Sequence, residues 1–379
     1  MKDHSLEVHG CHTYDATGAI SPSICLSATF RHPRFGESTG YDYGRVANPT
    51  RESLEKTVAL LERGGRSWAL SSGMAAVQLV FSLLSAGDHV LMSEDLYGGT
   101  VRLAEEVFAG YGITFEYVDV RDLALVGKRM RPETKLVFIE TPSNPMMQIA
   151  DIAALSALAH ENGALLAVDN TFLSPHFQKP LTLGADIVLH SGTKYLCGHN
   201  DVIAGFLVLK DATSAQAKRI ELLAKSAGPN LSALDSWLML RSIKTLGVRV
   251  ERQAENALAI ARWLGTLPEV TEVLYPGLAD HPGYALQQKQ ASGAGGMISF
   301  KVRSAELAKA ALGKLHLIAF AESLGGVETL LTYPIAQTHA EMPAALLKRT
   351  GLDDKLLRLS VGIEDVEDLK ADLQQALQG

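Results

Sequence analysis

Seven short apolar runs, each bounded by polar or turn-forming residues, recur between residues 67 and 210. Stretches with apolar residues at helical spacing, such as AALSALAHENGA, lie between several of them. Strands that alternate with helices predict βαβ units and a mostly parallel sheet covered by helices on both faces. The runs are SWALSS (67–72), HVLMSE (89–94), TFEYVDV (114–120), KLVFIET (135–141), LLAVDN (165–170), DIVLHS (186–191) and AGFLVLK (204–210).

The pattern changes on either side of these units. The first 50 residues are irregular and rich in Gly, Pro, Ser and Thr, which is typical of an extended arm. A helix follows Pro49, and near the other end one long helical segment at 237–265 leads to two strands, EVTEVLY and GMISFKV, and further helices. We therefore expect an arm (1–50), a large domain (51–235) and a smaller α+β C-terminal domain (236–379).

Composition narrows the class of protein. The chain has 379 residues, 47% of them hydrophobic, which is enough for a sizeable core in two domains. A net charge of -7 disfavours nucleic acid or an anionic membrane as partner. The start, MKDHSLEVHGCHTYD, is charged where a signal peptide is apolar, and no run approaches the roughly 18 residues of a membrane helix. Cys11, Cys25 and Cys197 form no CxxC pair, so we expect a cytoplasmic protein without a disulfide or a metal centre.

Candidate chemistry lies where strands end, because ligands of open α/β sheets bind beyond the carboxyl ends of the strands. Lys194 follows the buried run of DIVLHSGTKY, and burying a lysine is costly unless it is paired or neutral. Asp169 ends an otherwise apolar strand. Taken singly, the lysine could be a solvated residue and the aspartate could cap a turn.

Two further strand ends carry weaker indications. In SSGMAAVQLVF a strand turns through Gly73 into a helix whose free N–H groups could bind an anion, although a serine N-cap is the more common explanation. In LYGGT, Tyr97 could stack on a planar ligand or be a structural loop residue.

The four features together match the needs of pyridoxal 5'-phosphate. A desolvated lysine is nucleophilic, a buried carboxylate keeps the pyridine nitrogen protonated, an aromatic ring stacks on the cofactor, and a helix N-terminus holds the phosphate. Two other kinds of phosphate-binding motif are excluded. SGTKY is not a nucleotide-binding GxxxxGK[ST] loop, and GAGGM precedes a strand, whereas a dinucleotide-binding glycine motif follows one.

The same residues resemble the Cys/Met-metabolism enzymes that depend on pyridoxal phosphate. The resemblance covers essentially the whole chain through YDYGRVANPTR, SSGMAA, LYGGT, ETPSNP, VDNTF, HSGTKY, AESLGGVETL, THA and RLSVGIED. It implies a fold-type I transferase: a mostly parallel seven-stranded sheet with helices on both faces, plus the smaller α+β C-terminal domain. It also implies an obligatory homodimer, with a tetramer of two dimers expected, that acts on small amino acids.

The resemblance also implies roles for the residues around the cofactor. Lys194 would form the Schiff base and shuttle protons, Asp169 would pair with the pyridine nitrogen, and Tyr97 would stack on the ring and assist proton transfer. The phosphate would be held by the backbone N–H groups of Gly73 and Met74 and by Ser191 and Thr193.

Further residues are assigned to a neighbouring subunit and to the substrate. Tyr43 and Arg45 would reach the phosphate of a neighbouring subunit's cofactor. Asn144, Ser323 and Arg358 would bind the α-carboxylate of the substrate, for which a guanidinium with two parallel hydrogen bonds is suited.

Without the resemblance both arginines have ordinary interpretations. Arg45 would be a solvated residue of the arm, and Arg358 would pair with Glu364 or Asp365. The sequence departs from the family at Gly192, where alanine is frequent, without losing a reacting group.

The reaction has to be inferred from the rest of the pocket. Gly99 stands where methionine γ-lyases have cysteine, and Glu322 supplies a carboxylate for an amino-bearing partner such as cysteine or cystathionine. The motifs FRHPRFGESTGYDYGR and TYPIAQTHAEMP are most like the bacterial cystathionine γ-synthase and O-acetylhomoserine sulfhydrylase branch. We therefore expect γ-replacement on an O-acylhomoserine, with a cystathionine β- or γ-lyase as the alternative.

Overall fold

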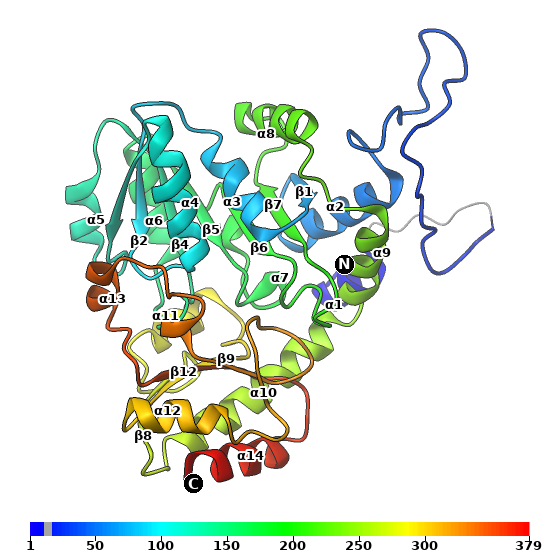
Figure 1. Ribbon diagram of the computed structural model, residues 1–379. Helices are drawn as coiled ribbons and strands as arrows, with labels where there is room; N and C mark the ends of the chain where they lie inside the picture. Colours follow the sequence, from blue (N-terminus) through cyan, green and yellow to red (C-terminus); the bar gives the residue numbers. More distant parts are fainter. Residues whose placement is uncertain (11–16, 379) are drawn as a thin grey trace.

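The computed structural model describes residues 1–10 and 17–378, so Cys11 lies outside the described residues. Two sheets form the body, and each has its own helices (Figure 1). Within the described chain, none of the helices has the length and apolar character needed to cross a membrane.

The larger sheet contains the seven predicted strands in the order β1-β7-β6-β5-β4-β2-β3. Strand β7 runs antiparallel to both β1 and β6, while the other neighbouring strands pair in parallel. The prediction of a mostly parallel seven-stranded sheet is thereby confirmed. The strands are β1 (Arg66–Leu70), β2 (His89–Ser93), β3 (Thr114–Val118), β4 (Thr134–Glu140), β5 (Leu165–Asp169), β6 (Ile187–Ser191) and β7 (Gly205–Leu209).

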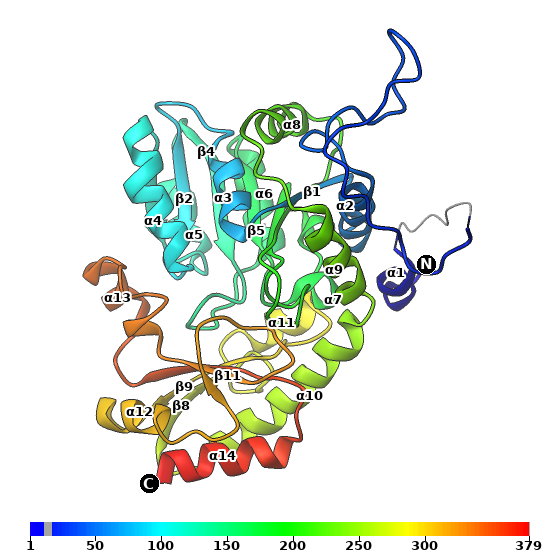
Figure 2. The same ribbon diagram turned by 45° about the vertical axis from the view of Figure 1, so that its right-hand side comes forward.

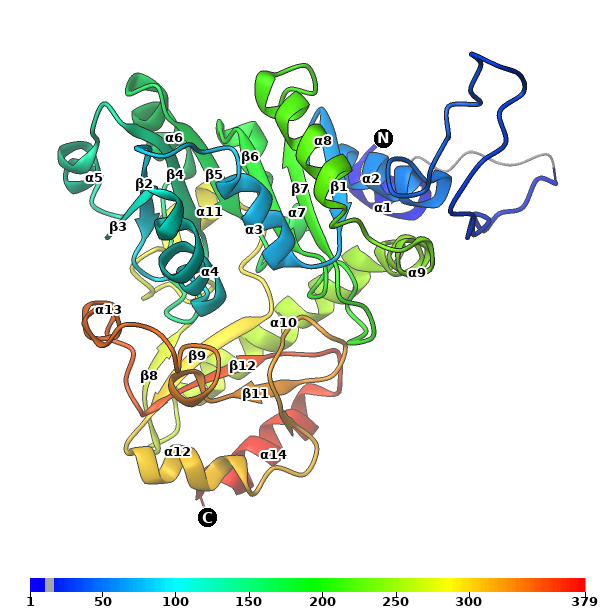
Figure 3. The ribbon, with the colours of Figure 1, turned by 45° about the horizontal axis from the view of Figure 1, so that its top comes forward.

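Both faces of this sheet are buried, which explains why its strands are almost continuously apolar. Successive side chains of a strand point to opposite faces, so Leu91 of β2 joins one core while Val90 and Met92 join the other. Helices cover both faces (Figure 3). One face carries α2 (Pro49–Leu61), α5 (Leu123–Arg129) and α6 (Ile152–Glu161), and the other carries α3 (Gly73–Phe81), α4 (Gly98–Leu103) and α8 (Ala215–Ala227).

The C-terminal sheet has five strands, two of which, β8 and β9, are the runs that the sequence indicated. Strands β10 and β11 have only two and three residues, too short to show a pattern, and β12 carries an arginine at its centre. The order is β10-β11-β12-β9-β8. The strands are β8 (Val270–Leu274), β9 (Met297–Val302), β10 (Ala319–Phe320), β11 (Leu330–Thr332) and β12 (Leu356–Ser360).

Only one face of this second sheet packs against its own helices. Leu357 and Leu359 of β12 join the core formed with α10 (Leu246–Leu264), α12 (Ala305–Leu312) and α14 (Val366–Gln378). Arg358 lies between these two leucines and therefore points to the opposite face, toward the large sheet.

The long helix expected at 237–265 is interrupted, which corrects that prediction. Helix α9 (Ala233–Ile243) ends before α10 begins. The Ser242 carbonyl at the end of α9 accepts hydrogen bonds from the Thr245 hydroxyl and from the Arg249 guanidinium, both at 3.1 Å. The Thr245 N–H donates to the same carbonyl at 3.1 Å, so a tight turn replaces the helical hydrogen bonds there. The domain boundary at residue 236 falls inside α9 and stays a prediction.

The N-terminal arm contains one helix that the sequence did not predict, α1 (Asp3–His9). The chain between residues 17 and 48 then extends away from the body (Figure 2). It exposes apolar side chains, including Phe35, which is fully exposed. The remaining α-helices of the described chain are α7 (Ser174–Phe177), α11 (Tyr284–Gln290) and α13 (Ala344–Thr350).

Candidate active site

A cavity of about 320 Å³ lies between the two sheets, beyond the carboxyl ends of β4, β5 and β6. Eleven of the thirteen residues predicted for the site line it, although they come from distant parts of the chain. These are Gly73, Met74, Tyr97, Asn144, Asp169, Ser191, Thr193, Lys194, Glu322, Ser323 and Arg358.

Lys194 follows β6 and reaches into the cavity from its floor. Its Nζ donates a hydrogen bond to the Ser323 Oγ at 2.8 Å. Burial, aided by the positive charge of Arg358, lowers the pKa of Lys194 to about 8, while the Glu322 carboxylate opposes this shift. A neutral amine is therefore far more accessible near neutral pH than it is for a surface lysine.

Two carboxyl groups lie side by side at the ends of neighbouring strands. Asp169 of β5 is in register with Glu140 of β4. Burial raises the pKa of Asp169, and hydrogen bonds from the Thr171 hydroxyl (2.5 Å) and amide (3.0 Å) oppose the rise. Burial, followed by the negative charge of Asp169, holds the pKa of Glu140 well above its usual value. A cationic ligand atom beside Asp169 would compensate this buried carboxylate.

The N-terminus of α3 forms one wall of the cavity. The Ser72 hydroxyl caps the helix by accepting from the Ala75 N–H at 3.1 Å, so the expected serine cap is present. The first N–H groups of a helix lack helical partners, and Gly73 and Met74 supply such groups at the cavity. A Cβ at Gly73 would lie 2.9 Å from the Ser191 Cβ. The absence of a side chain at Gly73 thus lets helix and strand approach closely enough to hold an anion between them.

Thr193 has an additional structural contact. Its hydroxyl donates to the Ala204 carbonyl at 3.2 Å and accepts from the Ala204 N–H at 3.0 Å. This pair holds the loop after β6 against the start of β7. The assignment of Thr193 to the phosphate stays a prediction.

Arg358 is buried on the side of the cavity formed by the C-terminal sheet, with 1% of its surface exposed. Its Nη1 donates to the Asn144 Oδ1 at 2.7 Å and its Nη2 to the Ser323 carbonyl at 3.3 Å. Its Nε is buried without a hydrogen-bond partner among the described residues. Burial lowers the pKa of Arg358 to about 10, so it stays charged. The alternative that it pairs with Glu364 or Asp365 is wrong, because the partners of its side chain in the described chain are Asn144, Ser323 and Thr332.

Tyr97 is positioned by its backbone and by a glycine. Its N–H donates to the Glu140 Oε2 at 3.0 Å, and its side chain is part of the cavity wall. A Cβ at Gly99 would lie 2.5 Å from the Tyr97 ring. Gly99 therefore leaves the space that the tyrosine ring occupies.

Tyr43 and Arg45 are the two predicted residues that do not line the cavity. The Arg45 guanidinium lies 5.6 Å from the centre of the Tyr43 ring and donates to the Lys225 carbonyl. Their predicted role in a neighbouring subunit stays a prediction.

Sequence reasoning missed Glu140, Thr171 and Thr338, which also line the cavity. Glu140 ends β4 just as Asp169 ends β5, so the strand-end rule could have found it. Thr338 lies in a loop far along the chain, and its carbonyl would be 2.4 Å from a Cβ at Gly98. Nothing in its local sequence indicates that contact.

Three groups in the cavity fit the pyridoxal 5'-phosphate that the sequence predicted. Lys194 has a lowered pKa, buried Asp169 needs a cation, and Arg358 has a donor to spare. Between them, the N-terminus of α3 and Ser191 line the cavity where an anion would be held. Pyridoxal 5'-phosphate has an aldehyde, a protonatable ring nitrogen and a phosphate to match these groups. The fold and the site thus define a pyridoxal-phosphate enzyme of fold type I.

Comparison with known proteins identifies the family. Residues 4–378 match the family described as Cys/Met metabolism PLP-dependent enzyme, and the chain belongs to that family. The cystathionine gamma-lyase of Bacillus subtilis (strain 168) is 47% identical over 379 residues, with both chains fully covered. The same organism's cystathionine gamma-synthase/O-acetylhomoserine (thiol)-lyase is 46% identical over 363 residues, covering 96% of this chain and 92% of the relative. The family works in methionine and cysteine metabolism, and its cofactor is pyridoxal 5'-phosphate.

Solved structures agree with this assignment. Cystathionine gamma-lyase from Lactobacillus plantarum, complexed with L-serine, matches with a TM-score of 0.96 and 42% identity, covering 100% of this chain and 99% of the other. Cystathionine gamma synthase from Xanthomonas oryzae pv. oryzae, in complex with aminoacrylate and cysteine, matches with a TM-score of 0.96 and 41% identity, covering 100% and 98%.

Proposed function

We propose that this enzyme replaces the γ-substituent of an O-acylhomoserine with a thiol. Cysteine as the thiol would give cystathionine, and sulfide would give homocysteine. The observation that carries the proposal is the 46% identity to a cystathionine gamma-synthase/O-acetylhomoserine (thiol)-lyase. The carboxylate of Glu322 lies in the cavity wall, next to Ser323, which contacts Lys194. A carboxylate there suits the amino group of an incoming cysteine.

The substrate would be held by its α-carboxylate. Arg358 stays charged, and the hydrogen bond to Asn144 already holds its guanidinium in place. The side chain therefore loses little conformational freedom when it forms two parallel hydrogen bonds to a carboxylate. This contact would place the substrate α-carbon near Lys194.

Lys194 would move the protons. Because its pKa is about 8, about half of the Lys194 amines would be neutral at that pH and able to accept a proton. The hydrogen bond to Ser323 keeps the amine directed into the cavity. We assign it removal of the α-proton and then of a β-proton, as departure of the γ-substituent requires. Bound pyridoxal phosphate supplies the electron sink that stabilises negative charge on the substrate carbons. Asp169 would hold the cofactor's ring nitrogen protonated, and Tyr97 would stack on the ring.

Product analysis tests this proposal. Cofactor-loaded protein incubated with O-acetyl- or O-succinylhomoserine and cysteine is expected to form cystathionine, and with sulfide, homocysteine. If neither donor yields a γ-replacement product with either thiol, the proposal is refuted.

A second candidate is a cystathionine γ-lyase. It is favoured by the 47% identity to a relative of that name over the full length of both chains. The same residues would then act on cystathionine, and the distal amino group of that substrate would meet Glu322.

A further inference from the structure

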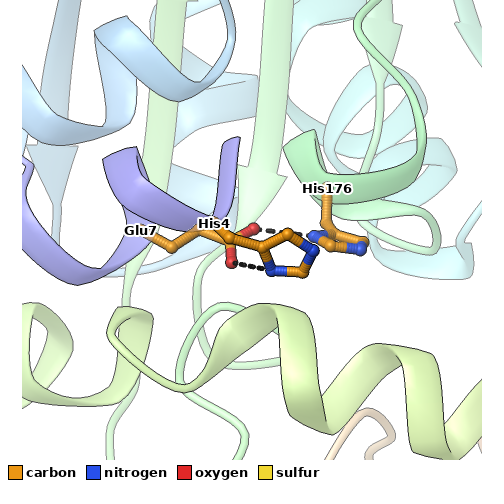
Figure 4. Close-up of side chains that lie close together, drawn as sticks. All are labelled: His4, Glu7 and His176. Atoms are coloured by element: carbon orange, nitrogen blue, oxygen red, sulfur yellow. Dashed lines mark hydrogen bonds and ion pairs between the residues drawn. The ribbon is translucent and has the colours of Figure 1, made fainter. Parts of the chain in front are cut away.

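A cluster of metal-binding side chains lies outside the active site, between the N-terminal arm and the body. It contains His4 and Glu7 of α1 and His176 of α7 (Figure 4). Each residue offers one ligand atom, and the three atoms lie within 4.8 Å of one another. Glu7 Oε1 is 2.7 Å from His176 Nδ1, and Glu7 Oε2 is 3.6 Å from His4 Nδ1.

Glu251 of α10 supplies a fourth group from the opposite side. Its Oε1 lies 3.4 Å from the Nε2 atoms of both His4 and His176. Each imidazole therefore has one nitrogen facing Glu7 and the other facing Glu251. A metal ion bound to one nitrogen would leave the other to a carboxylate, and this is how metal-ligating histidines are usually oriented.

The burial of Glu7 adds an electrostatic reason for a cation. Only 4% of Glu7 is exposed, and the Gly247 N–H donates to its Oε2 at 3.1 Å. Both of its ion-pair partners in the described chain are imidazoles, which carry charge only when they are protonated. A divalent cation would compensate the buried carboxylate at every pH at which the histidines are neutral.

The donor set selects the metal. The two imidazoles and the Glu7 carboxylate suit zinc and similar transition metals, whereas calcium and magnesium prefer all-oxygen sites. Ligand atoms about 2.0–2.1 Å from a tetrahedral zinc ion lie roughly 3.3 Å from one another. The 3.6 Å separation of Glu7 Oε2 from His4 Nδ1 is close to that value, and the three ligand atoms all lie within 4.8 Å of one another.

We propose that His4, Glu7 and His176 bind one zinc-type divalent metal ion that fastens α1 to α7, while the Glu251 carboxylate of α10 orients the two imidazoles through their other nitrogens. The site is structural, because it joins the start of the arm to the body away from the cavity. The sequence did not indicate a metal, since its ligands are spread over 173 positions from His4 to His176 and only the fold brings them together.

Zinc titration of the untagged, cofactor-loaded protein, after treatment with a chelator, tests the proposal. Calorimetry and elemental analysis are expected to give one zinc ion per chain. His4→Ala and Glu251→Gln should each weaken the affinity by about tenfold or more. Both positions are substantially exposed, at 62% and 47% of the side chain, so these variants are expected to fold.

His9→Ala is the matched control, because His9 lies on the same helix outside the cluster. It should bind zinc as tightly as the unmodified chain. The proposal is overturned if no zinc binds, if binding is unchanged in His4→Ala and Glu251→Gln, or if His9→Ala weakens it equally. If no zinc binds, the cluster is a network of hydrogen bonds and ion pairs between the histidines and the two carboxylates.

Discussion

At the scale of single residues, Lys194 has a property that can be measured before any substrate is added. Its pKa of about 8 places the change from charged to neutral amine inside an accessible pH range. Because only the neutral amine attacks an aldehyde, incorporation of pyridoxal phosphate into the cofactor-free protein should accelerate with pH. Below pH 8 we expect a rise of about tenfold per pH unit, with a plateau above it. Stopped-flow absorbance of the bound cofactor measures this rate.

The Glu322→Gln variant tests whether the pKa of Lys194 is the source of that pH dependence. The Glu322 carboxylate raises the pKa of Lys194, so its removal should lower the pKa and move the midpoint to lower pH. A midpoint that stays in place or moves upward would contradict this electrostatic account.

Replacing Lys194 with alanine tests its assignment to the cofactor. Lys194→Ala should lose the visible absorbance of the lysine-linked cofactor and nearly all turnover, since no other amine in the cavity wall can replace it. Spectra and product formation check this. A fully active variant would show that another residue carries the cofactor.

Arg358→Lys separates substrate binding from cofactor binding. Lysine keeps the positive charge but cannot form the two parallel hydrogen bonds of a guanidinium. We expect kcat/KM to fall about a hundredfold, the range for loss of a buried charged hydrogen bond, while the cofactor absorbance is retained. Loss of the cofactor together with activity would argue against a role confined to the substrate.

The residues of the site differ in how far the sequence could predict them. Lys194 and Asp169 were identifiable because polar groups at the ends of apolar strands are unusual. Arg358 is also polar among apolar residues, but it lies in the middle of β12 and not at a strand end, and its partner Asn144 lies 214 positions away. Its place in the site came from the family resemblance alone.

At the scale of elements, the approach of α3 to β6 determines how well the phosphate can be held. A Cβ at Gly73 would lie 3.0 Å from the Ser191 Cα, so Gly73→Ala must push the helix N-terminus away from the strand. We expect weaker cofactor binding, by about tenfold, because the helix N–H groups lose their alignment on the anion. Equilibrium titration with pyridoxal phosphate measures the change.

Gly127→Ala is the matched control for that substitution. Gly127 lies within α5, where a Cβ would meet only the Leu158 Cδ1 at 3.7 Å. Alanine should raise the free energy of unfolding by about 0.5–1 kcal/mol and leave cofactor affinity unchanged. Equal loss of affinity in both variants would contradict the role given to Gly73.

The elements of the two sheets also differed in predictability. The large sheet was predictable because burial on both faces makes each strand a continuous apolar run. In the smaller sheet, β12 is buried throughout as well, but Arg358 interrupts its apolar residues, so the strand lacks a continuous apolar run. Helix α9 could not be distinguished from α10, because side-chain contacts from Thr245 and Arg249 mark the break.

At the scale of the whole molecule, the arm has features of a subunit contact. Phe35 is fully exposed and Leu26 is 75% exposed in a segment that extends from the body. We propose that this arm packs on a second copy of the chain, as expected for a dimer in which Tyr43 and Arg45 reach the neighbouring cofactor.

Phe35→Asp tests the arm contact. It should weaken assembly, because a charge would enter an apolar interface, and it should lower cofactor retention. Tyr111→Asp, at a 65% exposed aromatic outside the arm, is the control. Sedimentation velocity is expected to show dissociation for Phe35→Asp alone. Unchanged assembly in that variant would remove the arm from the interface.

The direction of the reaction can be read from the products formed when the cofactor-loaded protein is given L-cystathionine without a thiol. We expect little turnover, far slower than the formation of cystathionine from an O-acylhomoserine and cysteine. Rapid release of cysteine and 2-oxobutyrate would make the enzyme a γ-lyase, and release of homocysteine and pyruvate would make it a β-lyase. Either result would contradict the proposed γ-replacement.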